Sequence, residues 1–270
     1  MKKIFKRIFK IGVLTFLAAI LTIAIIILFP QPLFANKMHY KEFTVYSNDK
    51  IEDNIKIVLD NAMHLVQQSE LYDSKYKYNI ILCNNSFYNK IDNKLFGKGP
   101  AAKATLHNVI FKVGIEAKNN LAFPIFPKAC TINLTEALAH EMIHCLQANK
   151  YGILKFNPFK HPEFWKLEGY PEYVSKQAAL SRKDYSLTND IDKYVTLERT
   201  ANSIWILPEE GGCEMPDYYY KGRLMITFLM GIRHWSYDQI LKDTASENTI
   251  YQDMIKWNDS TKMNEKKSLN

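Results

Sequence analysis

The pattern of hydrophobic positions begins with one long apolar run near the N-terminus. Residues Ile11 to Phe29 form 19 consecutive positions without a charged side chain. A helix of about 20 apolar residues crosses the hydrocarbon layer of a bilayer, so this run predicts a membrane-spanning helix, which Pro30 and Pro32 end. Basic residues precede the run, which predicts that the N-terminus stays in the cytoplasm while the remaining chain crosses the membrane.

Two interpretations of this segment stay open. A cleaved signal peptide carries an apolar run of about 7–15 residues and small residues before the cut. The run here is longer, and a cut after Ala35 would place Leu33 where a small residue is preferred. Length therefore favours an uncleaved signal anchor, in a single-pass protein of the cell membrane with an extracytoplasmic C-terminal domain, over secretion after cleavage. The expected organisation is a cytoplasmic basic stub and anchor in 1–35, one folded domain in 36–257 and a polar tail in 258–270.

The rest of the chain divides into strand-like and helix-like patterns. Strands are expected where apolar residues alternate or form short runs, and helices where they recur every three or four positions. Expected strands lie at 39–47, at 77–83 and, as a pair around a turn at His107, at 104–113. Expected helices lie at 51–72, 134–148, 162–180 and 217–235, with a short helix in the polar loop 84–99, an extended segment at 123–127 and a fraying tail from about Asn258. This order predicts an α+β fold, with a small mixed sheet in an N-terminal lobe and a mainly helical C-terminal lobe.

Net charge argues against a nucleic-acid partner. The chain carries a formal charge of +7, and five of its basic residues precede the apolar run. Without them, 30 basic residues face 28 acidic ones, so the folded domain is close to neutral. A near-neutral domain offers no broad surface for a polyanion. We expect no nucleic-acid partner.

The four cysteines match neither a zinc ribbon nor a CxxC redox motif. They are Cys83, Cys130, Cys145 and Cys213. In an exported domain they can form one or two disulfides, whereas Cys145, on an apolar helix face, also fits a buried thiol. Their pairing is not determined by the sequence.

The candidate chemistry lies in the segment His140-Glu141-Met142-Ile143-His144. Four residues are slightly more than one helical turn, so both imidazoles point the same way and can bind one tetrahedral cation. Glu141 flanks that cation, where its carboxylate can take a proton from water. The alternative is a helix with two surface histidines and an incidental glutamate.

A catalytic site of this kind needs a third protein ligand and an open fourth position. Glu168 lies 24 residues after His144, which leaves room for a loop and a returning helix. Glu172 lies four residues further, so on a continuous helix it shares that face and can hydrogen-bond the far nitrogen of a bound imidazole. His161 and Glu163 are the competing third ligands.

With these residues the sequence resembles the gluzincin metallopeptidases, the thermolysin-like group. Those enzymes carry an HExxH helix and a downstream helix that supplies the third ligand. The stretch from Glu168 to Tyr173, EGYPEY, is similar to the Glu-Gly form of many such domains, and the resemblance covers about Leu134 to Lys176.

The resemblance implies a zincin-like catalytic domain in 36–257 and a zinc-dependent peptidase, similar to metalloendopeptidases, that acts on peptides or proteins. One Zn²⁺ ion would be held by His140, His144 and Glu168, with Glu141 as the general base and Glu172 behind a ligand ring. The chain lacks the Gly-x-Met-Glu-Asn stretch of one aminopeptidase group, so exopeptidase action has no support.

Three details remain open around this site. Pro171 removes a backbone donor inside the expected ligand helix and can kink it, which leaves the orientation of Glu172 undetermined. Candidate donors to the oxyanion of a peptidase are Tyr219, Tyr220, Arg223 and His234. Tyr219 is preferred by analogy, although a tyrosine cluster on an amphipathic helix more often serves packing. The strand at 108–113 is a candidate sheet edge for aligning a peptide.

Two other functions compete with a peptidase. One is a non-catalytic, membrane-anchored binding domain that keeps a zincin fold. The other is a metal-dependent amidohydrolase that acts on a non-peptide amide, for which the chemistry at the metal would be the same. The substrate and the oligomeric state are not determined by the sequence.

Overall fold

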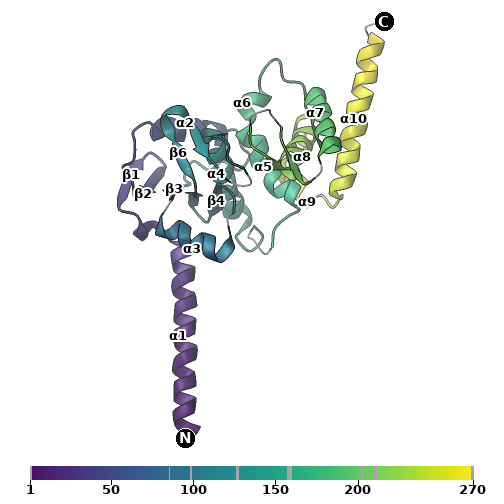
Figure 1. Ribbon diagram of the computed structural model, residues 1–270. Helices are drawn as coiled ribbons and strands as arrows, with labels where there is room; N and C mark the ends of the chain where they lie inside the picture. The colour runs from purple at the N-terminus through teal and green to yellow at the C-terminus, as the bar shows by residue number, and fades with distance from the viewer. Residues whose placement is uncertain are drawn as a thin grey trace.

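A computed structural model describes residues 2–84, 86–97, 99–125, 128–156, 160–201, 203–208 and 212–268. The first helix, α1 (Lys2–Leu28), projects alone from a body of two lobes (Figure 1). Within it, Ile4–Leu28 is long and apolar enough to cross a membrane, and none of its most apolar stretch of 18 residues is buried inside the structure. Both a membrane anchor and a signal sequence meet this description.

The first lobe is built on a five-stranded mixed sheet with the order β1-β2-β3-β5-β4. β1 and β2 pair antiparallel, β3 lies parallel to both β2 and β5, and β4 returns antiparallel to β5. The strands are β1 (Asn36–Tyr40), β2 (Phe43–Ser47), β3 (Tyr78–Leu82), β4 (Ala102–Thr105) and β5 (Asn108–Phe111). The small mixed sheet predicted for this lobe is therefore confirmed.

Two details of the sheet differ from the prediction. The segment 39–47 is part of a hairpin, because the chain reverses at Lys41, whose φ is 50°. The prediction that 108–113 forms a sheet edge is wrong, since β5 lies between β3 and β4. All four residues of β5 are buried, and the turn at Leu106 directs the less buried β4 to the outside.

Helices cover both faces of this sheet because its strands are apolar on both sides. Ile80 and Val109 face the main core, where α2 (Ile55–Val66) and α4 (Leu134–Tyr151) pack. Ile81 and Ile110 face a second apolar cluster that includes residues of α3 and of the end of α1. The remaining elements before α4 in the chain are η1 (Gln31–Leu33), α3 (Phe87–Phe96), β6 (Gly114–Glu116), η2 (Ala117–Asn119), β7 (Leu121–Phe123) and β8 (Ile132–Asn133).

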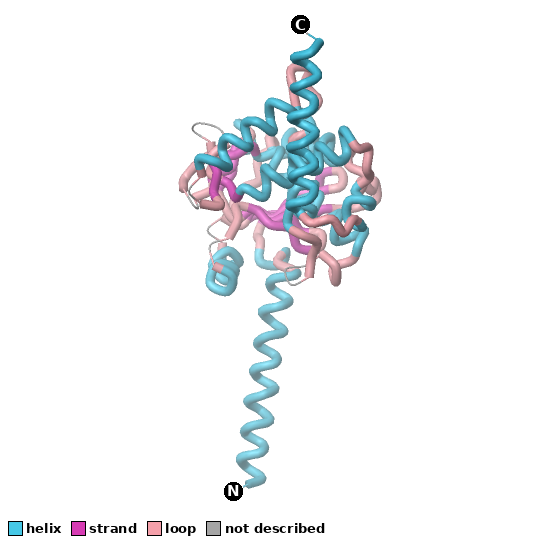
Figure 2. The backbone as a smooth tube through the Cα atoms, turned by 90° about the vertical axis from the view of Figure 1, so that its right-hand side faces the viewer, coloured by secondary structure: helices cyan, strands magenta, loops and turns pink. Residues whose placement is uncertain are grey.

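The second lobe is mainly helical, as predicted. Its elements are α5 (Phe164–Ser175), α6 (Gln177–Leu180), α7 (Leu187–Thr200), β9 (Trp205–Ile206), β10 (Met215–Pro216), α8 (Asp217–Thr227), the π-helical turn η3 (Phe228–Ile232), α9 (Tyr237–Lys242) and α10 (Glu247–Ser268). The helix expected at 162–180 is interrupted at Lys176, and the one expected at 217–235 ends in η3. Helix α10 continues through the segment expected to fray, and it extends from the opposite end of the molecule to α1 (Figures 1 and 2).

A disulfide joins the two lobes. Cys130, which precedes β8, is bonded to Cys213, which precedes β10. Cys83 and Cys145 are free and buried, which confirms the buried thiol predicted at Cys145. Of the four tryptophans, Trp165 is fully buried, and the other three are partly exposed.

Candidate metal centre

Helix α4 presents both histidines of the candidate site on one face. The side chain of Asn133 accepts a hydrogen bond from the backbone N–H of Glu136 and caps the first turn, while Gly152, with a φ of 83°, ends the helix. An asparagine cap at the start and a glycine at the end are usual helix boundaries, and they agree with the helix expected at 134–148. On the continuous helix between them, the rings of His140 and His144 lie 4.8 Å apart.

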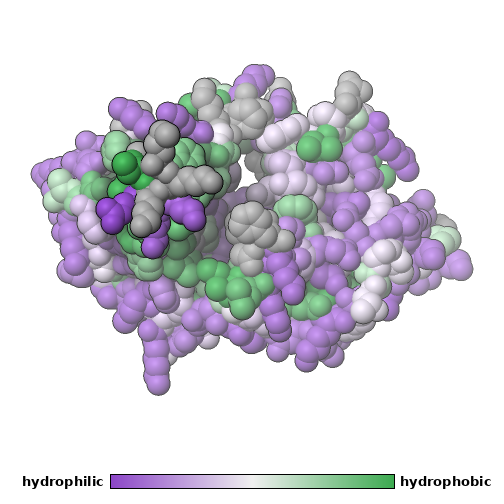
Figure 3. Space-filling model, turned by 90° about the horizontal axis from the view of Figure 1, so that it is seen from below, coloured by the Kyte–Doolittle hydropathy of each residue, from purple (hydrophilic) through white to green (hydrophobic). Residues whose placement is uncertain are grey.

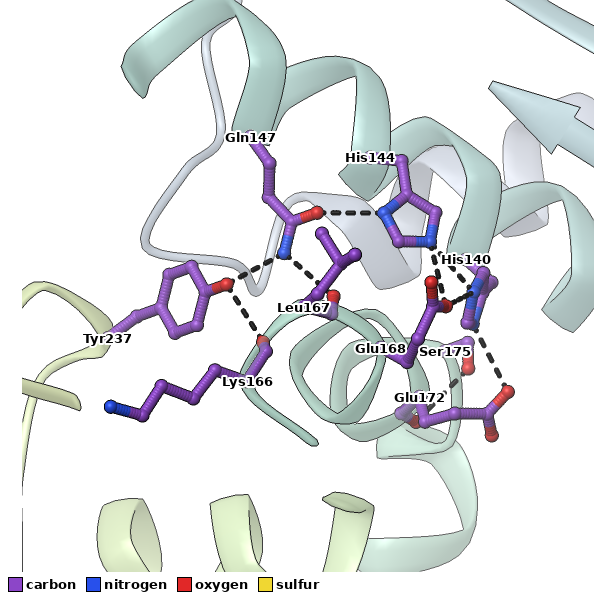
Figure 4. A network of polar contacts seen from close by, with 9 residues as sticks. All are labelled: His140, His144, Gln147, Lys166, Leu167, Glu168, Glu172, Ser175 and Tyr237. Carbon is purple, nitrogen blue, oxygen red and sulfur yellow. Dashed lines mark hydrogen bonds and ion pairs between the residues drawn. The ribbon is translucent and has the colours of Figure 1, made fainter. Parts of the chain in front are cut away.

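Helix α5 brings Glu168 against these two rings (Figure 4). The Nε2 atoms of His140 and His144 lie 3.1 Å apart, and Oε2 of Glu168 lies 3.2 Å from the first and 3.1 Å from the second. Ligand atoms around a tetrahedral ion with bonds of about 2.0–2.1 Å are separated by about 3.3 Å. The three atoms therefore form nearly one face of such a tetrahedron. Within the described ranges, this is the one group of three or more His, Cys, Asp or Glu side chains arranged to hold a metal.

Gln147 determines which nitrogen of His144 carries the proton. Its Nε2 donates to the carbonyl of Leu167 at 3.1 Å and to the hydroxyl of Tyr237 at 2.8 Å, so its Oε1 is the atom that faces the ring. Oε1 lies 2.8 Å from Nδ1 of His144. Since an amide oxygen only accepts, Nδ1 carries a hydrogen, and Nε2 is the nitrogen that faces Glu168 and is placed to bind a metal.

Glu172 lies behind His140, on the same face of α5 as Glu168. Its Oε1 is 3.1 Å from Nδ1 of His140, within the distance of an ion pair. Pro171 does not interrupt α5, which stays helical from Phe164 to Ser175. The side chain of Glu172, whose orientation the sequence left undetermined because of Pro171, therefore points toward His140.

The carboxylates of the site produce a strong negative field. Burial disfavours the charged rings, but contact with Glu168 and Glu172 outweighs it and raises the pKa of His140 to about 10. Burial likewise opposes the charge of Glu168, yet the two histidines hold its pKa well below the usual range. For Glu141, burial is the largest influence and raises the pKa. The same field that stabilises a protonated imidazole would stabilise a divalent cation between the rings.

Of the candidate oxyanion donors, Tyr219 lies nearest the histidines. Its ring centroid is 5.8 Å from that of His140. The hydroxyl of Tyr220 donates to Asp190 at 2.5 Å, and Arg223 forms an ion pair with the same carboxylate at 2.8 Å. The side chain of His234 is exposed beyond η3. Tyr219 is the one member of this set that contacts a ring of the site.

Neither competing third ligand joins the cluster. The ring of His161 packs against that of Phe164 at 4.7 Å, and its Nδ1 contacts the carbonyl of Pro162. Glu163 precedes α5 and accepts a hydrogen bond from the indole N–H of Trp165 at 2.7 Å. Both side chains are used in the local packing where α5 begins.

Two glycines set the separation of α5 and α8. A Cβ atom on Gly169 would lie 2.5 Å from the backbone of Gly222, so the helices touch without side chains between them. Gly169 follows Glu168, and Gly222 lies three residues after Tyr219. The close approach therefore fixes where α8 carries this tyrosine relative to the ligand carboxylate.

Comparisons with known proteins add no assignment. No family model matches this chain, and neither a curated protein nor a solved structure matches it. The geometry of the site and the chemistry of its side chains are the basis for a functional argument.

Proposed function

We propose that this chain is a zinc-dependent peptidase with a zincin-like domain, similar to the thermolysin-like gluzincins and anchored to the cell membrane by α1. The observation that carries the proposal is the triangle of Nε2 atoms from His140 and His144 with Oε2 of Glu168, whose edges measure 3.1–3.2 Å. Three donors at these separations suit a small tetrahedral ion and leave its fourth coordination position for water or substrate.

The donor set favours zinc. Two neutral imidazole nitrogens and one carboxylate oxygen form a ligand set used by hydrolytic zinc enzymes, whereas magnesium and calcium prefer oxygen donors throughout. Hydrogen bonding to the far ring nitrogens is a usual feature of zinc sites, and Gln147 and Glu172 stand in those positions.

The chain's own residues account for the proton transfers of amide hydrolysis. When bound, the ion would polarise the scissile carbonyl and acidify water in the site. Glu141, whose pKa burial raises, would take the proton from the attacking water and pass it to the leaving amine. The hydroxyl of Tyr219, kept protonated because burial raises its pKa, would donate a hydrogen bond to the developing oxyanion.

The proposed substrate is a peptide or protein outside the cytoplasm. Basic residues before the apolar run favour an N-terminus in the cytoplasm. The Cys130–Cys213 bond fits an oxidising, extracytoplasmic compartment for the folded domain.

Metal content and peptide cleavage by the purified full-length chain test this proposal. We expect one zinc per chain, and cleavage that a chelator abolishes and added zinc restores. Replacing Glu141 by Gln should lower turnover by at least about 100-fold while zinc stays bound, because the variant loses the base and keeps every ligand. Replacing His144 by Ala should remove both zinc and activity.

His161→Ala is the matched control, because this histidine lies outside the ligand triangle. It should keep both zinc and activity. Zinc binding without cleavage of any peptide in a library, or of amides from the cell wall, would instead indicate a binding domain. Cleavage of the wall amides alone would indicate an amidohydrolase. Full activity in Glu141→Gln would exclude this residue as the base.

A further inference from the structure

Helix α3 lies at the foot of the domain, next to the point where α1 enters it. The hydroxyl of Tyr88, in α3, lies 3.5 Å from the carbonyl of Ile27. Ile26 and Leu33 pack on the same apolar cluster as Tyr88. In two views at right angles, α3 runs crosswise to α1 at the level where α1 meets the body (Figures 1 and 2).

The domain holds the end of α1 without a free linker. The side-chain amide of Asn108, in β5, donates to the carbonyl of Leu28 at 2.9 Å, and Gln31 donates to the same side chain at 2.6 Å. Asn108 is 2% exposed, so this connection is part of the folded core. A membrane that α1 crosses must therefore end close beneath this side of the domain.

The outward face of α3 is apolar and largely exposed, and the Nζ atom of Lys103 lies 5.5 Å from the ring centroid of Phe96. Phe87 is 62% exposed, Leu95 48% and Phe96 66%, with the partly exposed Ile91 between them. Positions 87, 91 and 95 follow the spacing of one helical stripe. The opposite face of the helix is buried, through Tyr88, Asn89 and Asp92.

Two lysines accompany this stripe. Lys90 and Lys94 are both exposed, one turn apart on α3. Helices that lie in the headgroup layer of a bilayer combine buried aromatic and aliphatic side chains with lysines that reach the lipid phosphates. Seen from the side of α1, the rim of the domain is mainly hydrophilic, and apolar residues occur beside α1 and toward the middle of the face (Figure 3).

We infer that α3 is a second membrane contact, a helix that lies flat in the headgroup layer of the bilayer that α1 crosses. Phe87, Leu95 and Phe96 enter the boundary between headgroups and acyl chains, while Lys90 and Lys94 contact phospholipid phosphates. The partner is the lipid surface. A second contact beside the anchor holds the domain in one orientation above the membrane. The inference rests on the membrane anchor of the proposed function and is independent of zinc and catalysis.

The test measures the depth of single positions in the full-length chain. Phe87→Cys and Leu95→Cys are labelled with a nitroxide and reconstituted into nanodiscs of zwitterionic and anionic phospholipid. Collision rates with oxygen, which concentrates in lipid, and with a water-soluble nickel chelate are then compared. Ile57→Cys is the matched control, since Ile57 is an apolar residue of α2, 63% exposed. The native free cysteines are buried and should stay unlabelled.

We expect the oxygen-to-nickel collision ratio to be several-fold higher at positions 87 and 95 than at position 57. Replacing both Lys90 and Lys94 by Glu should lower that ratio in anionic nanodiscs. Equal ratios at all three positions would overturn the proposal. Protection of 87 and 95 from both reagents would overturn it in favour of contact with a second protein copy. A full-length chain that does not enter nanodiscs would overturn both the anchor and this proposal, without bearing on zinc or activity.

Discussion

At the scale of single residues, Gln147 connects the two helices that carry the proposed ligands. Pro171 has no N–H, so the carbonyl of Leu167, four residues earlier, lacks its helical partner. The buried amide of Gln147 supplies that donor and uses its oxygen to orient His144. One side chain thus ties a ring of α4 to the backbone of α5, one residue before Glu168.

Replacing Gln147 by Leu should weaken metal binding by about 10–100-fold, because His144 loses the contact that fixes its ring. The Leu167 carbonyl would also lose a donor inside the protein, which costs about 1–3 kcal/mol of stability. Competition with a chromophoric chelator and thermal unfolding measure the two effects. Gln68→Leu, at an exposed position after α2, is the control and should change neither. Unchanged affinity in the Gln147 variant would show that His144 needs no support from this amide.

The sequence predicted which side chains meet but not what supports them. Helical spacing pairs His140 with His144 and Glu168 with Glu172, whereas the meeting of the two helices was expected from the family resemblance. Gln147 gave a usable signal, since it lies three residues after His144 on the same helical face. Its partner is a carbonyl exposed by a proline in another helix, and that pairing exists only once α4 and α5 have packed.

At the scale of elements, the crossing of α5 and α8 depends on Gly169 and Gly222. The backbones approach closely enough that a methyl group on Gly169 would overlap the carbonyl group of Gly222. The backbone of Gly222 cannot rotate away as a side chain does. The two helices must therefore separate to make room for the methyl group. The Glu-Gly pair noted in the sequence thus joins a proposed ligand to a packing requirement.

Gly169→Ala should destabilise the protein by about 1–3 kcal/mol, the usual cost of overpacking a core. It should also lower activity, because α8 would carry Tyr219 away from His140. Unfolding curves and peptide cleavage measure the two effects. Gly231→Ala is the control, since a methyl group there meets no atom within 4 Å. Wild-type stability in Gly169→Ala would mean that the helices separate at no cost.

The contact between α7 and α8 makes a pH-dependent contribution to stability. Burial opposes the charge of Asp190, but Arg223 and neighbouring hydroxyl groups lower its pKa below the usual value. A carboxyl group with a depressed folded-state pKa stabilises the fold above its unfolded pKa of about 3.9. That contribution is lost as the pH falls through the lower, folded-state value.

Asp190→Asn should lower stability at pH 7 by about 3–5 kcal/mol, because Arg223 would remain buried without its anion. The difference from wild type should begin to shrink below about pH 4, where the unfolded-state carboxyl group becomes protonated, and should be lost as the pH falls through the lower, folded-state pKa of Asp190. Unfolding at pH 7 and pH 3 provides the comparison. Asp192→Asn, which breaks the more exposed pair with Lys262, should cost less than about 1 kcal/mol. Equal losses in both variants would contradict the role of burial.

At the scale of the whole molecule, the sequence predicted the α+β layout and the two lobes but not the full set of helices. Helix α4 was clear from its apolar pattern. The position of β5 inside the sheet was missed, because strand order depends on long-range pairing that no local pattern records. The tail from about Asn258, which forms the second half of α10, was expected to fray because of its polar composition. In the structure Asn258 is 2% exposed, and both Asn258 and Lys262 donate to Asp192 of α7, contacts that depend on tertiary packing.

The bond between Cys130 and Cys213 closes a covalent ring around the central part of the chain. Its two ends are 83 residues apart, and the ring contains α4 and α5 with all three proposed ligands, whereas Tyr219 lies just outside it. The turn after α4, where Leu154 is 81% exposed, is the kind of surface segment that proteases cut. A single nick there would leave both ligand helices on one connected molecule.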